Sequence, residues 1–272
     1  MEREGRGPIS SFFEQVRTLV ERGIPPLDRT QRIARELKRS KELSGTWRLN
    51  TSFSITGLPA VGKTTQLDLL SIMYDVPSAS MYKIGELQRA LAGSEKGENK
   101  PIERPPVYDT VVDGIQLEII SSADKMQPFI LDSRLAGVWR EVVRKRDNPQ
   151  IANSMKAIFL ELPEDIAAKR RAKQMKGLTP EEIVKESQDR TAFDIDQFSK
   201  TSIAQENPEI MDLIKDPFNP GLFDVIIDAN DSEHGVFMKI HRYLRESGCV
   251  VKVNNQPQAE NEIKKNGIVF EG

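Results

Sequence analysis

Short apolar runs and helical patterns alternate through the middle of the chain. Three runs, at 129–131, 157–162 and 223–227, have the length and composition of buried strands. The Thr-, Ser- and apolar-rich stretch 47–55 predicts a further strand, and a short one is expected just before Lys83. Apolar residues at helical spacing predict helices over 63–74, 83–92, 110–123, 163–175, 179–198 and 233–244. Strands that alternate with helices favour a parallel sheet covered on both faces.

The two ends of the chain differ from this pattern. One helix is predicted over 9–22, and a second over 30–43 carries mostly Arg and Lys on its outer positions. Such a charged face is usually solvated, and the less favoured alternative is a contact with nucleic acid or another acidic partner. The polar stretch 93–106 predicts an exposed loop. Residues 249–272 predict either a tail or an edge strand that docks on the core. We therefore divide the chain into an N-terminal helical extension at 1–47, a core domain at 48–247 and a C-terminal tail at 248–272.

Composition narrows the classes of function. The chain has 272 residues and a net charge of -2, which argues against a generally basic nucleic-acid binder. With one cysteine, Cys249, it cannot form an internal disulfide, and its two histidines offer little for a zinc centre. No apolar run approaches the ~18 residues of a membrane helix, and the first residues do not resemble a signal peptide. We expect a cytoplasmic protein with no membrane partner.

The strongest motif is a phosphate-binding loop. Residues 57–64, GLPAVGKT, match the pattern G-x-x-x-x-G-K-[ST] without a mismatch, between a predicted strand and a predicted helix. In such a loop, successive backbone N–H groups and the helix N-terminus face phosphate oxygens. Lys63 supplies a full positive charge, and the Thr64 hydroxyl is a suitable Mg²⁺ ligand. The nucleotide-binding residues predicted from this motif are Gly57, Leu58, Pro59, Ala60, Val61, Gly62, Lys63, Thr64 and Thr65.

Further candidates follow the next predicted strands. Asp132 ends the run 129–131, where a carboxylate can lie beside the phosphate loop and bind Mg²⁺. Arg134, two residues later, can bind an acceptor phosphate through two hydrogen bonds. Arg89, on the helix after Lys83, is a candidate for a second contact with that phosphate.

In their order along the chain, these pieces resemble the cytidylate kinase family of nucleoside monophosphate kinases, over about 52–244. Residues 132–137, DSRLAG, are similar to the family signature D-[SG]-R-L-A-G. Gly85, Glu86 and Arg89 resemble its G-[DE]-x-x-R segment. A third match, to its D-x-x-x-D-x-x-Q helix, is made by Asp109, Asp113 and Gln116.

The resemblance implies a three-layer α/β fold of the P-loop NTPase type, with a five-stranded parallel sheet, a helical lid and acceptor-binding segments. It implies an ATP-dependent kinase that uses Mg²⁺ and phosphorylates a nucleoside monophosphate, best a pyrimidine such as CMP or dCMP. The implied catalytic residues are Lys63, Asp132, Arg134, Arg171 and Arg190, the last two as lid arginines. The implied substrate-binding residues are Gly85, Arg89, Asp113 and Arg134, and the implied metal ligands are Thr64 and Asp132.

Four positions depart from the family pattern. Lys83 stands where the family usually has serine, and Ile115 stands where arginine is frequent. Met175 and Gln197 replace two further lid arginines. Two alternatives therefore remain: a P-loop kinase with another small acceptor, and a nucleotide-binding regulatory protein with weak turnover. Loss of lid cations favours the second, because less charge would be neutralised in the transition state.

Overall fold

A parallel sheet of five strands forms the centre of the protein. The computed structural model describes residues 28–39, 43–91, 106–174, 177–201, 205 and 208–253. In the sheet the strand order is β3-β4-β2-β5-β6, and every pairing is parallel. The strands are β2 (Ser52–Gly57), β3 (Met81–Lys83), β4 (Ile130–Asp132), β5 (Met155–Glu161) and β6 (Val225–Asp228). This arrangement confirms the fold class predicted from the sequence.

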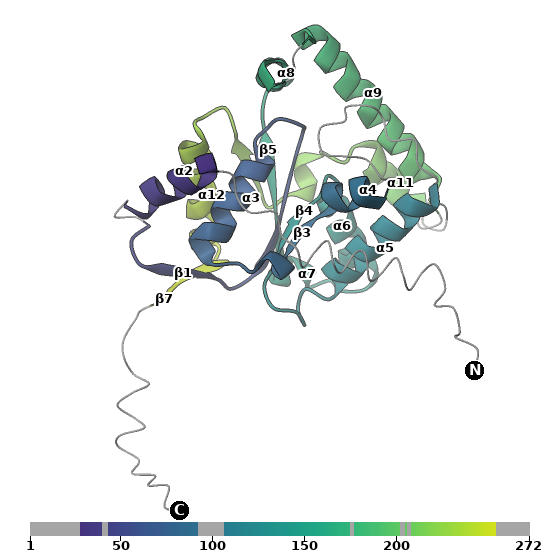
Figure 1. Ribbon diagram of the computed structural model, residues 1–272. Helices are drawn as coiled ribbons and strands as arrows, with labels where there is room; N and C mark the ends of the chain where they lie inside the picture. The colour runs from purple at the N-terminus through teal and green to yellow at the C-terminus, as the bar shows by residue number, and fades with distance from the viewer. Residues whose placement is uncertain are drawn as a thin grey trace, which may run out of the picture.

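Helices cover both faces of the sheet (Figure 1). One face carries α2 (Asp28–Lys38), α3 (Lys63–Tyr74) and α12 (Glu233–Glu246). The other carries α4 (Ile84–Leu91), α5 (Pro106–Ser121), α6 (Ala136–Arg146), α7 (Ile151–Ser154) and α11 (Pro208–Lys215). Short 3-10 turns lie at Ser78–Ser80 and Pro220–Leu222. Neighbouring strand residues face opposite sides, so Ile130 packs with α3 in one hydrophobic cluster whereas Leu131 packs in the other.

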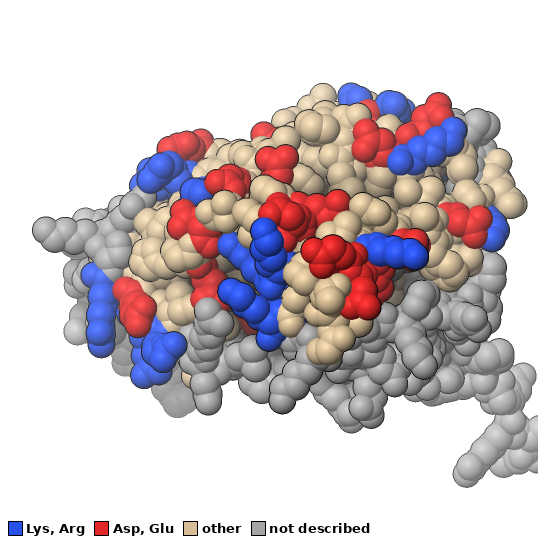
Figure 2. All heavy atoms as spheres, turned by 90° about the horizontal axis from the view of Figure 1, so that it is seen from above, with Lys and Arg blue, Asp and Glu red and all other residues tan. Residues whose placement is uncertain are grey.

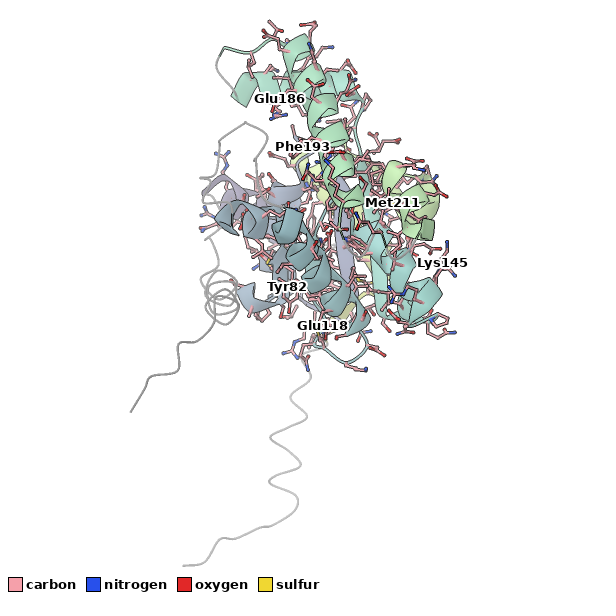
Figure 3. The ribbon with its side chains drawn as sticks, turned by 90° about the vertical axis from the view of Figure 1, so that its right-hand side faces the viewer. Tyr82, Glu118, Lys145, Glu186, Phe193 and Met211 are labelled. Atoms are coloured by element: carbon pink, nitrogen blue, oxygen red, sulfur yellow. The ribbon has the colours of Figure 1, made fainter. Side chains whose placement is uncertain are left out.

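Two helices, α8 (Glu164–Gln174) and α9 (Pro180–Ser199), extend beyond the sheet at the top of Figure 1. We call them the lid helices. A capping box starts α9: the Thr179 hydroxyl accepts from the backbone N–H of Glu182, whose carboxylate accepts from the N–H of Thr179. The far end of α9 packs beside α11 (Figure 3). The lid helices are thus attached to the body at two places: through α8, which follows β5 and whose Arg170 donates to the Ala229 carbonyl, and through the far end of α9.

The prediction of one strand over 47–55 was wrong. The stretch forms two strands, β1 (Thr46–Leu49) and β2, and β1 pairs antiparallel with β7 (Val250–Val253) in a separate ribbon. The break has a clear cause: the backbone N–H groups of Asn50 and Thr51 both donate to the carbonyl of Cys249, at 2.7 and 3.2 Å. The chain therefore changes hydrogen-bonding partners between the two strands.

The helix predicted over 30–43 is present as α2, which packs against α3 through Ile33, Ala34 and Leu37. Its basic residues Arg32 and Arg35 are exposed. Segments that we assigned to the N-terminal extension and to the C-terminal tail thus contribute α2 and β7 to the same hydrophobic cluster as the sheet. The helix predicted over 9–22 and the loop predicted over 93–106, up to its last residue, lie outside the described residues. Among the described helices, none combines the length and the apolar character that crossing a membrane requires.

Candidate active site

The phosphate loop joins the carboxyl end of β2 to the first turn of α3, as the motif predicts. A Cβ atom on Gly57 would lie 2.7 Å from the carbonyl oxygen of Leu160, so only glycine fits beside β5. Gly62 caps α3 with a left-handed φ of 94°, and Ala60 also has a positive φ, of 63°. These conformations make the backbone curl at the helix N-terminus, where its N–H groups and the helix dipole favour a bound phosphate.

Lys63 lies over this loop. Its Nζ donates to the carbonyl oxygens of Gly57 at 2.6 Å and of Leu58 at 3.0 Å. The Thr64 side chain is exposed, and Thr65 is half-buried. The loop therefore presents an ammonium and a hydroxyl beside a curled backbone, a set that fits the phosphates of a nucleoside triphosphate and a hard cation.

Asp132 lies at the same edge of the sheet as the phosphate loop. Its Cα pairs with Ile55 on one side and with Lys83 on the other. Thr56 Oγ1 also donates to the Ser133 carbonyl at 2.8 Å, which ties the end of β2 to the turn after β4. Because Ile130 packs on the α3 side and alternate residues share a face, the half-buried Asp132 side chain lies on the α3 side as well. A carboxylate there suits the magnesium role predicted for it.

A buried polar chain holds the turn after β4. Ser133 Oγ donates to Gln116 Oε1, and Gln116 Nε2 donates to Asp113 Oδ1 at 3.2 Å. The N–H of Leu135 donates to Ser133 Oγ at 3.2 Å. Asp113 has no exposed surface. In this structure it therefore supports the Asp132 turn through α5, and its role toward an acceptor base or sugar stays a prediction.

Arg134 reaches the lid helices. Its Nη2 donates to Thr191 Oγ1 on α9 at 3.1 Å, and its guanidinium lies 5.9 Å from the centre of the Phe218 ring. Thr191 and Phe218 were not predicted. Thr191 directly follows Arg190, which is a usable signal, whereas Phe218 lies in a stretch without a recognised motif. The position of Arg134 connects the end of β4 to the lid.

Arg171 also lies in the lid, where it forms an ion pair. Its Nη2 donates to Glu186 Oε1 on α9 at 2.9 Å. Arg171 lines a small, open hollow together with Leu58 and Pro59 of the phosphate loop. Glu186 was not predicted. Figure 3 shows Glu186 on the protruding part of α9 and Phe193 lower on the same helix.

For most of the remaining predicted residues, the structure gives only the position of the backbone. Gly85 and Arg89 lie in α4, which follows β3 directly, and Arg190 lies in α9. The side chains of Arg89 and Arg190 fall outside the described part of the protein, as does Met175. Gln197 donates to Asp196, one residue away in α9, at 3.3 Å.

Lys83 forms a mostly buried ion pair at this edge of the sheet. Its Nζ lies 3.4 Å from Asp68 Oδ1 on α3, and the exposed fractions of the two side chains are 16% and 10%. Asp68 was not predicted, although a carboxylate on the otherwise mostly apolar stretch 66–70 is a signal for it. Viewed from above, the molecule carries basic and acidic side chains close together in the middle of its face (Figure 2). Lys83 and Asp68 show the same mixing of signs inside the site.

Comparisons with known proteins agree with this geometry at the level of the fold. A protein-family model described as "AAA domain" matches residues 56–184, just under half of the chain. A search of curated protein sequences found no match.

Two solved structures are similar over most of the chain. One is an uncharacterized protein from Eubacterium ventriosum ATCC 27560, with 16% identity, a TM-score of 0.43 and coverage of 72% of this chain and 98% of that one. The other is a gluconokinase from Sinorhizobium meliloti 1021, with 12% identity, a TM-score of 0.39 and coverage of 73% and 98%. The strand order, the phosphate loop and the family match assign the chain the α/β fold of P-loop kinase-like proteins.

Proposed function

We propose that the protein transfers a phosphoryl group from ATP to a nucleoside monophosphate, best a pyrimidine nucleotide such as CMP or dCMP. One observation carries the proposal: three adjacent strand ends bring the phosphate loop, Asp132 and Lys83 to one edge, with Arg134 two residues beyond Asp132. Cations on the acceptor side of a triphosphate site suit an acceptor that is itself a phosphate ester. The resemblance to cytidylate kinases supplies the choice of base.

Phosphoryl transfer requires that the acceptor phosphate and the γ-phosphate be aligned and that their negative charge be neutralised. An oxygen of the acceptor phosphate attacks the γ-phosphorus in line, the bond to the bridging oxygen breaks, and ADP leaves. The second pKa of a phosphate monoester is ~6, so the acceptor is largely dianionic at neutral pH and needs no strong base. This suits a site in which none of the predicted residues is a histidine; His241 is buried in the core against Tyr74.

Each residue then has a limited task. Lys63 neutralises charge on the donor phosphates, and Arg134 orients the acceptor phosphate. Mg²⁺ would supply further charge neutralisation, with the Thr64 hydroxyl and the Asp132 carboxylate as its ligands on this chain. Closure of the lid helices over the phosphates would exclude water and limit ATP hydrolysis.

A second candidate function is nucleotide-dependent regulation with weak turnover. The ion pair between Arg171 and Glu186 favours it, because it engages a lid cation within the lid itself. In that case ATP would bind and the lid would respond, while transfer would be slow.

One assay separates these functions. ADP release is measured with ATP–Mg²⁺ and a panel of CMP, dCMP, UMP, AMP and unphosphorylated sugars. We expect the highest kcat/KM with CMP or dCMP, and loss of transfer in Lys63→Ala but not in Lys215→Ala, whose lysine lies on α11 with an exposed side chain. Faster transfer to a sugar than to every monophosphate would contradict the acceptor. Tight ATP binding without acceptor-dependent release would favour regulation.

A further inference from the structure

Lys83 occupies the junction between the donor and acceptor sides. It ends β3, its Cα pairs with Asp132, and α4 begins at the next residue. Met81, two positions earlier, packs against the same hydrophobic cluster as α3, so the alternation of a strand directs Lys83 toward α3 as well. Lys83 thus shares the α3 face of the sheet edge with Asp132.

Asp68 holds the Lys83 ammonium at this place. It lies one helical turn beyond Thr64 on α3, so the two side chains share a helix face. The 3.4 Å contact between Lys83 Nζ and Asp68 Oδ1 uses one of the three donors of the ammonium. Asp68 therefore fixes the position of the Lys83 ammonium, whose other N–H groups can donate to an anionic ligand.

Burial makes this lysine hard to explain by packing alone. Placing an ammonium at 16% exposure costs free energy that an apolar side chain of the same length would avoid. The charge also has an electrostatic consequence. An anionic acceptor that approaches this corner meets the carboxylates of Asp68 and Asp132, and Lys83 offsets their repulsion.

We propose that Lys83 is a specificity-determining residue that binds the anionic group of the acceptor and selects a phosphate monoester, with Asp68 as its positioning residue. The proposal rests on the phosphoryl transfer proposed above and assigns that site its substrate class. It also gives a physical meaning to the lysine that replaces the serine of related kinases: the acceptor phosphate gains a charge-assisted hydrogen bond close to the phosphate loop.

The test compares four variants of the full chain. Lys83→Met removes the charge and keeps the length, Lys83→Arg restores a charge, and Lys83→Met/Asp68→Asn removes both charges of the pair. Lys156→Met is the matched control, because Lys156 is a half-buried strand lysine near the amino end of β5, where its Nζ donates to the Ala152 carbonyl. The KM values for CMP and for ATP and the melting temperature are measured for each.

A bound phosphate that loses one charge-assisted hydrogen bond should bind about 10- to 100-fold more weakly. We expect Lys83→Met to raise the KM for CMP by that factor with the KM for ATP changed less than about threefold, and Lys83→Arg to recover part of the loss. We expect the double variant to regain melting temperature but not affinity for CMP. If the double variant regains both the melting temperature and the affinity for CMP, Lys83 only neutralises the charge of Asp68, and the proposal is wrong. An unchanged KM for CMP in Lys83→Met would also overturn it.

Calorimetric titration separates a failure of this proposal from a failure of the proposed reaction. If the unaltered protein transfers no phosphoryl group, CMP and cytidine are titrated onto it and onto Lys83→Met in the presence of a non-hydrolysable ATP analogue. Binding of CMP but not cytidine, lost in Lys83→Met, supports the anion site without any turnover. Equal binding of CMP by both proteins, or binding by neither, rejects it.

Discussion

Arg171 of α8 and Glu186 of α9 join the two lid helices through a hydrogen bond of 2.9 Å, with 10% and 23% of their side chains exposed. The pair neutralises an arginine that the resemblance to cytidylate kinases assigns to the transferred phosphoryl group. Under the proposed function, Glu186 would compete with the phosphates for the same guanidinium. Substitution of Glu186 therefore tests directly whether Arg171 contributes to turnover.

Glu186→Gln should raise kcat several-fold, because the amide keeps the shape of the side chain but attracts Arg171 less. The same change should lower the free energy of unfolding by about 1–3 kcal/mol, since it weakens a partly buried charge-assisted hydrogen bond. Steady-state kinetics and urea unfolding measure the two effects. Glu181→Gln, at an exposed position on the same helix, is the control and should change neither. A drop in kcat would show that Glu186 orients Arg171 productively.

Arg134→Lys and Asp132→Asn should fail in different ways. Lysine lacks the planar fork of arginine, so Arg134→Lys should raise the acceptor KM or lower kcat while ATP affinity is nearly kept. Asp132→Asn should increase the Mg²⁺ concentration needed for half-maximal rate and reduce turnover with every acceptor. Kinetics in which ATP, acceptor and Mg²⁺ are varied separately measure both. Equal loss of ATP affinity in the two variants would show that Arg134 binds ATP rather than the acceptor.

Leu37→Ala should destabilise the whole core by about 2–5 kcal/mol, because Leu37 is fully buried between α2 and the rest of its cluster. Lys38→Ala, the exposed neighbour on the same helix, should have almost no effect. Urea unfolding followed with and without ATP measures the two changes. If Leu37→Ala leaves the unfolding midpoint unchanged, the segment before residue 47 is an independent addition to the core.

Tyr74 should make the protein sensitive to alkali. Its hydroxyl bonds to His241 Nδ1 at 2.8 Å in the core, and burial raises its pKa above the usual 10.0. Because the folded pKa lies above the unfolded one, this contribution to stability is complete below pH 10.0 and declines as the pH rises above it. Unfolding free energies between pH 8 and 11 should therefore fall more steeply in the unaltered protein than in Tyr74→Phe. Tyr82→Phe provides the comparison: burial also raises the pKa of the half-buried Tyr82, so this change should flatten the pH profile less than Tyr74→Phe. Parallel pH profiles for Tyr74→Phe and the unaltered protein would contradict the assignment.

The sequence predicts the local structure of the phosphate loop well because its residues are contiguous. A strand, a glycine-rich turn and a helix follow one another between residues 52 and 74, so the local pattern contains almost all the information. Asp132 is also predictable, because parallel strands place their carboxyl ends at one edge.

The contacts of Arg134 and of the lid helices are less predictable. Arg134 meets Thr191 across 57 positions of sequence, and Arg171 meets Glu186 across 15. Such pairs depend on how helices pack, which no local pattern records. The break between β1 and β2 likewise depends on a carbonyl far along the chain, that of Cys249.

The ribbon of β1 and β7 brings the two flanks of the core together, since Thr46 pairs with Val253. It adjoins the amino end of β2, whereas the phosphate loop follows the carboxyl end of that strand. Sequence joined after β7 therefore starts on the side away from the phosphate loop. A tag or a further domain attached there would leave access to the phosphate-loop edge of the sheet open.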